Sequence, residues 1–379
     1  MTTGPEGAAA AGDYPHPVRA AVLRVVGEPM VVETIHLKTV GPDDVRVRID
    51  QTGVCHSDLS LARGVLQQPV PAVLGHEACG TIVELGESVV DLDVGQRVVL
   101  LWITPCRDCF HCAQGESHLC SNGSRRAAVP HAMTEQGEPV FPGLTVGAFA
   151  EQTVVPRDAV VAVPDDIATA DAALLGCAVT TGVGAVIKTA KVTPGSSVVV
   201  IGLGGVGLSV LQGARLAGAS TIIAVDRNGD KEPAARAAGA HHFVPADQDT
   251  KSAVRDLTAM RGADFAFDCA GSSRTIRDMW SMTRRGGTCT VVGIGGKDDK
   301  VSFSALELFY FARTLHGCVA GSLDAAHDLP SFFDLVRTGK LDLGQLVTGH
   351  GGLTDINDAL DQVAAGRGIR TLLGPAPSR

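Results

Sequence analysis

Ser197-Val-Val-Val-Ile-Gly-Leu-Gly-Gly-Val-Gly207 is the stretch that decides the fold of this 379-residue chain. The apolar run from Ser197 to Gly202 is typical of a buried strand, and Val206 to Ala217 is predicted to be a helix. The turn between them contains four glycines, Gly202, Gly204, Gly205 and Gly207. A glycine turn that opens a helix lets a pyrophosphate approach unpaired backbone N–H groups. The stretch therefore predicts a dinucleotide-binding turn.

Apolar strands alternate with amphipathic helices on the C-terminal side of this turn. The pattern predicts strands at Thr221 to Asp226, Phe265 to Cys269 and Gly287 to Gly293, with a helix at Lys231 to Ala238. Such alternation is typical of an α/β fold with a parallel, doubly wound sheet.

Asp226 ends the second strand, nineteen residues after Gly207. A carboxylate there would accept hydrogen bonds from the adenosine ribose and repel a 2′-phosphate, which favours NAD over NADP. Arg227 follows directly and could instead pair with a phosphate. An ordinary tight turn and a helix cap are the alternative interpretations of the glycines and of Asp226. Their combined spacing favours the dinucleotide site.

Four cysteines lie within fifteen residues, at the spacing C-x2-C-x2-C-x7-C. Four thiolates packed this closely predict a tetrahedral zinc site. The spacing alone does not exclude a disulfide pair or an iron–sulfur cluster. The residues concerned are Cys106, Cys109, Cys112 and Cys120.

A second set of possible metal ligands is dispersed along the chain, at Cys55, His76 and Cys177. Two thiolates and one imidazole leave one tetrahedral position open, which is the arrangement of a catalytic zinc. This second set favours zinc for the four-cysteine run as well.

Composition excludes several other classes of protein. Ten cysteines are too dilute for a disulfide scaffold, so we expect reduced thiols and a cytoplasmic location. The net charge of −9 comes with no basic block that would follow a nucleic acid. Apolar runs stay below the roughly 18 residues of a membrane span. Residues 1–17, rich in Ala, Gly and Pro, are predicted to be a disordered extension.

From Val18 to about Val163 the chain has short β-rich runs, which predict a mostly antiparallel β domain. These runs are Arg19 to Val25, Asp44 to Thr52, Ala78 to Leu85, Arg97 to Trp102 and Ala148 to Val155.

After about Gly321 the chain returns to helices and loops. Helices are predicted at Pro330 to Thr338 and Asp355 to Gly366, followed by a short tail from Ile369 to Gly374. This terminal piece is too small for a core of its own. We expect it to pack back on the β domain, so that the nucleotide domain is an insertion.

From Val18 to Leu373 the chain resembles the zinc-dependent medium-chain alcohol dehydrogenases. The matching motifs occur in the family's order: Gly53-Val-Cys-His-Ser-Asp58, Leu74-Gly-His-Glu-Ala78, the four cysteines, Leu175-Gly-Cys177, Thr180-Thr-Gly182, the glycine turn and Ile369-Arg-Thr371. The resemblance implies a GroES-like catalytic domain at 18–184 and 323–379, and a Rossmann NAD-binding domain at 185–322.

The resemblance also implies roles for the residues around two zinc ions. Cys55, His76 and Cys177 would hold the catalytic zinc, and the four-cysteine run a structural one. Ser57 matches the hydroxyl that accepts the alcohol proton. Asp58 matches the carboxylate that orients His76. Glu77 is expected behind the zinc, either as a transient ligand or as a buried structural carboxylate.

Further residues match the family's cofactor site. Thr181 and Val206 are expected near the nicotinamide, and Lys231 near the adenosine ribose. Val292 is a further expected cofactor-binding residue. Arg370 and His56 match the two positions that contact the pyrophosphate.

Two features bear on the proton pathway and on assembly. Ser60 stands where several relatives carry a histidine that passes the proton to solvent. The segment from Ser121 to Val146 resembles the long loop of the dimeric branches. We therefore expect a homodimer that uses the sheet edge around Gly295 to Phe309.

The expected reaction is reversible oxidation of primary alcohols, aromatic or of medium chain length, with NAD. A thiol-dependent formaldehyde dehydrogenase would share these motifs, with Arg125 and Arg126 as candidates to hold the carboxylates of glutathione or mycothiol. A non-catalytic zinc- and nucleotide-binding protein is a more remote alternative, because no ligand or proton acceptor is missing. The pocket is expected near Ser57, Leu66, Trp102, Phe149 and the turn from Val292 to Gly295.

Overall fold

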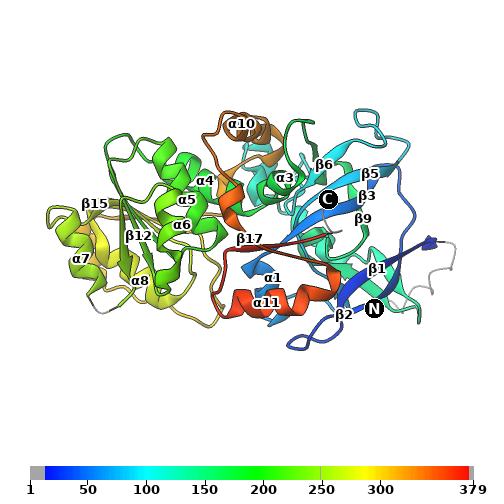
Figure 1. Cartoon of the computed structure of the whole chain (residues 1–379), viewed down its shortest axis with the longest axis horizontal. Coiled ribbons are helices and arrows are strands. Elements are labelled where there is room, and N and C mark those ends of the chain that lie inside the picture. The colour runs from blue at the N-terminus through cyan, green and yellow to red at the C-terminus, as the bar shows by residue number, and fades with distance from the viewer. Residues whose placement is uncertain (1–12, 248, 375–379) are drawn as a thin grey trace.

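The computed structural model describes residues 13–247 and 249–374. A parallel sheet flanked by helices lies beside a β-rich part that contains both ends of the described chain (Figure 1). The predicted extension lies mostly outside the described residues. Strand β1 (His16–Leu23) starts three residues before Arg19, where its start was expected, since His16 and Pro17 pair with Leu37 and His36 of β2 (Val31–Leu37).

The parallel sheet has six strands, and every neighbouring pair runs in the same direction. Numbered along the chain, its strand order is 3-2-1-4-5-6, which is the order of a dinucleotide-binding Rossmann sheet and confirms the predicted fold. Across the sheet the strands are β13 (His242–Pro245), β12 (Thr221–Asp226), β11 (Ser197–Ile201), β14 (Ala263–Asp268), β15 (Thr283–Val291) and β16 (Thr314–Gly317).

Side chains of β11 alternate between two cores, one on each face of the sheet. Val198 and Val200 pack with Leu211 of α5, while Val199 and Ile201 pack in a second cluster with helices on the opposite face. This alternation explains the uninterrupted apolar run, because both faces are buried. The helices are α5 (Gly205–Leu216) and α6 (Glu232–Ala237) on one face, and α7 (Thr250–Leu257) and α8 (Ser273–Met282) on the other.

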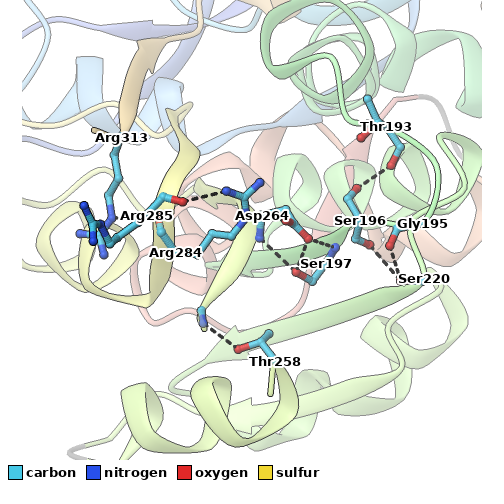
Figure 2. Close-up of polar contacts among 11 residues, drawn as sticks. Thr193, Gly195, Ser196, Ser197, Ser220, Thr258, Asp264, Arg284, Arg285 and Arg313 are labelled. Carbon is cyan, nitrogen blue, oxygen red and sulfur yellow. Dashed lines mark hydrogen bonds and ion pairs between the residues drawn. The ribbon is translucent and has the colours of Figure 1, made fainter. Parts of the chain in front are cut away.

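Asp264 joins three segments at the amino ends of the parallel strands (Figure 2). The glycine turn follows the carboxyl end of β11 and so lies at the opposite end of the sheet. The backbone N–H and the hydroxyl of Ser197 both donate to Asp264 Oδ2, at 2.8 and 2.7 Å. Arg284 Nε donates to Oδ1 at 2.6 Å. The carboxylate thereby fixes β11 and β15 on either side of β14.

The β-rich part has a closed barrel and a seven-stranded sheet. Its pairs are antiparallel except β4 with β8 and β17 with β18, in agreement with the prediction. Besides β1 and β2 the barrel contains β7 (Ala132–Thr134), β8 (Pro139–Pro142) and β4 (Ala72–Val73). The sheet contains β10 (Val160–Ala162), β6 (Arg97–Leu100), β5 (Glu77–Leu85), β3 (Asp44–Val54), β18 (Arg370–Leu373), β17 (Val347–Gly351) and β9 (Gln152–Pro156).

The C-terminal segment returns to this sheet, as predicted. Strand β18 pairs antiparallel with β3 and parallel with β17. Helix α11 (Ile356–Ala364) follows the prediction closely, but α10 (Ala325–Arg337) begins five residues before Pro330, where its start was expected. Leu329 is fully buried on the same face as Phe332 and Phe333, so packing extends the helix through the proline.

The remaining α-helices are α1 (His56–Ala62), α2 (Phe110–Ala113), α3 (Thr169–Leu175), α4 (Ala178–Gly184) and α9 (Ala305–Phe311). Among them, α1, α3 and α4 lie next to the candidate site. Helix α4 continues into a π-helical segment, Ala185–Ala190. Within the described ranges no single helix has the length and apolar character to cross a membrane. One bent pair, Thr169–Leu175 with Ala178–Ala190, satisfies these criteria by length and composition only, with a bend of 53°.

Candidate active site

The three dispersed ligand candidates converge at one buried point. Cys55 follows β3 and precedes α1, His76 lies between β4 and β5, and Cys177 precedes α4. Their sulfur and nitrogen ligand atoms all lie within 4.8 Å of one another. The Nε2 atom of His76 is buried and lacks a hydrogen-bond partner among the described residues. Two sulfurs, one unpaired imidazole nitrogen and this spacing fit a zinc ion.

Asp58 organises two of these ligands from behind. Its Oδ1 lies 3.0 Å from His76 Nδ1 and accepts from the Gly75 N–H, also at 3.0 Å. Its Oδ2 accepts from the Cys55 N–H at 3.0 Å. The bond at Nδ1 leaves Nε2 free to bind a metal, as the expected role of Asp58 requires.

The hydrogen bond between the two thiols of the site shifts their pKa values in opposite directions, lowering that of Cys55 and raising that of Cys177. A hydrogen bond from Cys177 lowers the pKa of Cys55 well below its usual value, although burial opposes this shift. The positive charge of Arg370 lowers it further. The protein thus favours one thiolate at this point, which is the form that binds zinc.

Glu77 and Arg370 form a buried ion pair, with Oε2 and Nε 3.2 Å apart. Arg370 also donates through Nη1 to the Val54 carbonyl at 3.0 Å. Burial raises the pKa of Glu77 to about 7, while the charge of Arg370 opposes the rise. Glu77 does not belong to the three-ligand cluster, and its contact favours the structural role over that of a transient ligand.

The expected proton acceptor lies at the start of α1. Ser57 is partly exposed, and its Oγ is 3.8 Å from the Cys55 sulfur. Ser60 is buried one turn later in the same helix. His56 is exposed at the first position of α1.

The glycine turn has the shape that a pyrophosphate needs. Gly202 has a φ of 88°, and an ideal Cβ at Gly207 would lie only 1.9 Å from the Gly202 carbonyl oxygen. A side chain at either position would therefore open the turn. A Cβ at Gly205 would lie 2.5 Å from Arg370 Nη2. The guanidinium thus lies beside the first turn of α5 and connects the glycine turn with Glu77.

Asp226 holds this turn from the end of β12. Its Oδ2 accepts from the Leu203 N–H at 2.7 Å, and its Oδ1 accepts from the Asn228 N–H at 2.9 Å. Lys231 Nζ lies 3.5 Å from Oδ2. Arg227 is exposed and extends towards Gly366, where an ideal Cβ would lie 3.6 Å from Arg227 Nη2. Asp226 therefore fixes the backbone of the glycine turn through Leu203 and also places a carboxylate beside that turn.

Of the residues expected near the nicotinamide, Thr181 lies on the helix that follows the candidate ligand Cys177. Thr181 is buried in α4, close behind Cys177. An ideal Cβ at the neighbouring Gly182 would lie 2.5 Å from the Val206 carbonyl oxygen, so α4 and α5 touch here. Val292 is buried directly after β15.

The four-cysteine run folds into a compact lobe around α2. All four sulfurs lie within 4.8 Å of one another, and all ten cysteines of the chain are free thiols. The disulfide alternative is therefore wrong for this structure. The Cys112 N–H lowers the pKa of Cys109 to about 6 by hydrogen bonding. Burial raises the pKa of Cys112 to about 12, so the four thiols are not all shifted towards thiolate, but four sulfurs clustered this closely fit a closed zinc site.

Aromatic residues line the same region. The Trp102 ring meets the His76 ring edge-on, with centroids 6.5 Å apart. Phe149 packs on Gly75, where an ideal Cβ would lie 2.7 Å from Phe149 Cδ1. Both were expected near the pocket. Residues that the motifs did not indicate also belong to this region: Thr145, which bonds to the Trp102 carbonyl, and the buried His131 beside Gly147.

Comparison with known proteins agrees with this arrangement. The family model of the alcohol dehydrogenase GroES-like domain matches residues 41–165, and that of the zinc-binding dehydrogenase domain matches 205–338. S-(hydroxymethyl)glutathione dehydrogenase from Paracoccus denitrificans is 34% identical over 372 residues, with 94% of this chain and 99% of that protein covered. Alcohol dehydrogenase-like 7 from Arabidopsis thaliana is 35% identical over 370 residues, with 94% of each covered.

Solved structures lead to the same family. Benzyl alcohol dehydrogenase from Acinetobacter calcoaceticus has a TM-score of 0.88 and 31% identity, with 95% of this chain and 99% of that one covered. An alcohol dehydrogenase zinc-binding domain protein from Burkholderia ambifaria has a TM-score of 0.89 and 30% identity over the same shares. With the GroES-like and Rossmann parts, the glycine turn and both clusters of metal ligands present, this chain belongs to the zinc-dependent alcohol dehydrogenases of the medium-chain dehydrogenase/reductase superfamily.

Proposed function

We propose that this protein oxidises primary alcohols to aldehydes reversibly, with NAD as hydride acceptor and two zinc ions per chain. The observation that carries the proposal is the buried cluster of Cys55, His76 and Cys177, held by Asp58. Three ligands would leave one position of a tetrahedral zinc for the substrate. A closed lobe of four cysteines elsewhere supports a second, structural zinc, since it leaves no position for a substrate.

Zinc in the three-ligand site would act as a Lewis acid that lowers the pKa of the alcohol, and NAD would accept the hydride. The chain's own groups then have three tasks. Ser57, 3.8 Å from the Cys55 sulfur, accepts the alcohol proton. Asp58 keeps the His76 ring oriented through Nδ1. The buried contact with Glu77 holds the Arg370 guanidinium beside the glycine turn, where a pyrophosphate would bind.

Preference for NAD is supported by Asp226. Its carboxylate is buried at the end of β12, where a 2′-phosphate would have to be accommodated. Lys231 already lies near this carboxylate, and Arg227 extends towards Gly366 instead of folding over Asp226. Neither cation therefore stands free beside the ribose position to attract a phosphate.

An aromatic or medium-chain alcohol is supported by the walls of the site. Trp102 contacts His76, and Phe149 contacts Gly75 immediately before it. Aromatic side chains bury apolar substrates well and can stack on a ring. The similarity to a benzyl alcohol dehydrogenase supports the same substrate class.

A thiol-dependent formaldehyde dehydrogenase is the second candidate, because curated relatives carry the name S-(hydroxymethyl)glutathione dehydrogenase. Arg125 and Arg126 are exposed on the short 3-10 helix Gly123–Ala128. Gln68 Nε2 donates to the Ala127 carbonyl of this helix at 3.3 Å and connects it to the loop that follows Leu66. The arginines could therefore meet the carboxylates of a thiol adduct.

The deciding experiment follows reduction of NAD and NADP with a panel of alcohols, and with formaldehyde in the presence or absence of glutathione or mycothiol. Efficient use of benzyl and medium-chain alcohols without a thiol supports the proposal. Formaldehyde oxidation only with a thiol, abolished in Arg125→Ala/Arg126→Ala, supports the second candidate. Binding of zinc and NAD with no turnover under any condition would favour the non-catalytic alternative.

A homodimer through the edge of the Rossmann sheet is supported by exposed apolar side chains. Strand β16 ends the sheet, and the adjoining α9 exposes Leu306 and Phe309 by 71% and 83%. Contiguous apolar surface of this kind is typical of protein interfaces. Light scattering should give twice the chain mass for the wild type and the single mass for Phe309→Glu. A monomeric wild type would contradict the expected assembly.

A further inference from the structure

The segment from Gly143 to Gly147 has an unusual backbone for its sequence. Leu144 and Thr145 have φ values of 45° and 67°, and Gly147 has 68°. Non-glycine residues rarely adopt this left-handed conformation, and a β-branched threonine is among the least suited to it. Such conformations persist only where the surroundings impose them, and they are frequent at functional sites.

Surrounding contacts do hold this segment in place. The Thr153 hydroxyl donates to the Val146 carbonyl at 2.6 Å. Directly after the segment, the Ala148 N–H donates to the Gly75 carbonyl at 2.9 Å. Gly75 precedes the candidate zinc ligand His76, so the segment is built against the metal site. The strand was predicted to begin at Ala148, but β9 begins at Gln152. These bonds explain the difference, because they hold Ala148 against Gly75 instead.

The side chain of Thr145 reaches a second part of the site. It is 5% exposed, and its hydroxyl donates to the Trp102 carbonyl at 3.1 Å. Trp102 follows β6 and leads into the four-cysteine lobe, and its ring lies edge-on to His76. Glycine would satisfy the backbone of position 145 without strain, but it could not supply this hydroxyl.

We infer that Thr145 is a positioning residue: its hydroxyl fixes the Trp102 wall of the substrate pocket and thereby sets which alcohols fit. This inference rests on the proposed alcohol oxidation and adds a determinant of its specificity. Thr145 does not touch the metal ligands itself. It acts through the backbone of Trp102, whose ring position depends on that carbonyl being held.

Two substitutions separate the hydroxyl from the backbone strain. Thr145→Val keeps the branched shape at the same φ and removes the hydroxyl, whereas Thr145→Ser keeps the hydroxyl. Thr153→Val is the matched control, because it removes the hydroxyl that anchors the neighbouring Val146 and leaves the Trp102 contact intact. Trp280, the other of the two tryptophans, is first replaced in all variants by Phe, so that fluorescence reports Trp102 alone.

In Thr145→Val we expect the Trp102 emission to shift, because the carbonyl loses its partner and the ring loosens. The ratio of kcat/KM for benzyl alcohol to that for ethanol should change by about tenfold, mainly through KM. Thr145→Ser should restore both values to within about twofold of the parent. Thr153→Val should lower the melting temperature without either change.

Unchanged emission and an unchanged substrate ratio in folded Thr145→Val would overturn the inference. Equal effects of Thr145→Val and Thr153→Val would also overturn it, since the cause would then be general loosening of the segment. If Thr145→Val does not fold, Thr145→Ser against Thr145→Ala provides the same comparison. Should the parent oxidise no alcohol at all, the proposed function fails, while the Trp102 emission still reports whether Thr145 holds the wall.

Discussion

Replacement of Asp58 by Asn tests how strongly the carboxylate organises the metal site. The carboxylate accepts at both oxygens: Gly75 N–H and His76 Nδ1 at Oδ1, and Cys55 N–H at Oδ2. An amide has one acceptor oxygen. In its better orientation it keeps the bonds to Gly75 and His76 and turns its NH2 group towards the Cys55 N–H, so that one bond becomes a contact between two donors.

The magnitude follows from this single lost bond. A hydrogen bond to a charged group contributes about 1.5–3 kcal/mol, and about 1.4 kcal/mol corresponds to a tenfold change in affinity. Zinc affinity of the three-ligand site should therefore fall by about 10- to 100-fold, which agrees with the general effect of removing partners behind metal ligands. Turnover should fall by a similar factor at limiting zinc.

The assay is competition with a chromophoric chelator, because it resolves a weakened site from an intact one. Asp264→Asn is the matched control: that carboxylate also binds two donors on a neighbouring strand, but it lies at the opposite end of the Rossmann sheet. It should lower the melting temperature and leave both zinc sites intact. Zinc affinity and turnover of Asp58→Asn within twofold of the wild type would refute the reasoning.

Three further predictions concern the cofactor, the lobe and a buried histidine. Asp226→Gly should weaken NAD binding and shift the cofactor preference towards NADP. Affinity for both cofactors should also fall somewhat, because the Leu203 N–H loses its acceptor. An unchanged preference in cofactor titrations would contradict the assignment. Cys109→Ser should lower the melting temperature and the zinc content without changing the ranking of alcohols; a changed ranking with full stability would place the lobe in the reaction. Burial lowers the pKa of His131 from 6.5 to about 4, with a smaller contribution from the Lys38 charge. Between these pH values the unfolded chain binds a proton that the folded chain does not, so the free energy of unfolding should fall by about 3 kcal/mol as the pH drops from 6.5 to 4. His131→Asn keeps a donor for the Val140 carbonyl but has no titrating imidazole, so in denaturant titrations its free energy of unfolding should fall by about 3 kcal/mol less than that of the wild type over the same pH range. Equal decreases in the two proteins would show that His131 is not responsible.

The sequence predicted best where chemistry restricts the choice of residue. The glycine turn was recognisable because a Cβ at Gly207 would collide with the Gly202 carbonyl. The ligands Cys55, His76 and Cys177 were recognisable because few residue types bind zinc, and the structure brings all three together. The parallel, doubly wound sheet was predictable from the alternation of strands and helices, and the structure adds its strand order. The domain boundaries at 184/185 and 322/323 stay predictions.

Contacts between distant segments could not be predicted in this way. Glu77 and Arg370 were each recognised, and the tail was expected to pack back on the β domain. Their pairing depends on β3 being the strand partner of β18 and on the register of that pair, which no local pattern encodes. The left-handed conformation of Thr145 contradicts its own preference and results from the surrounding bonds. Helix α10 runs through Pro330 because buried Leu329 extends its packing face, which outweighs the usual place of proline at a helix start.

The central claim is that Cys55, His76 and Cys177 hold an open zinc that is separate from the closed lobe. Zinc content of the wild type and Cys177→Ala, measured together with NAD binding and alcohol turnover, tests this claim most directly. The account predicts two zinc ions per chain in the wild type and one in the variant, with NAD binding kept and turnover lost. A variant that retains two zinc ions and oxidises alcohols at the wild-type rate would contradict it.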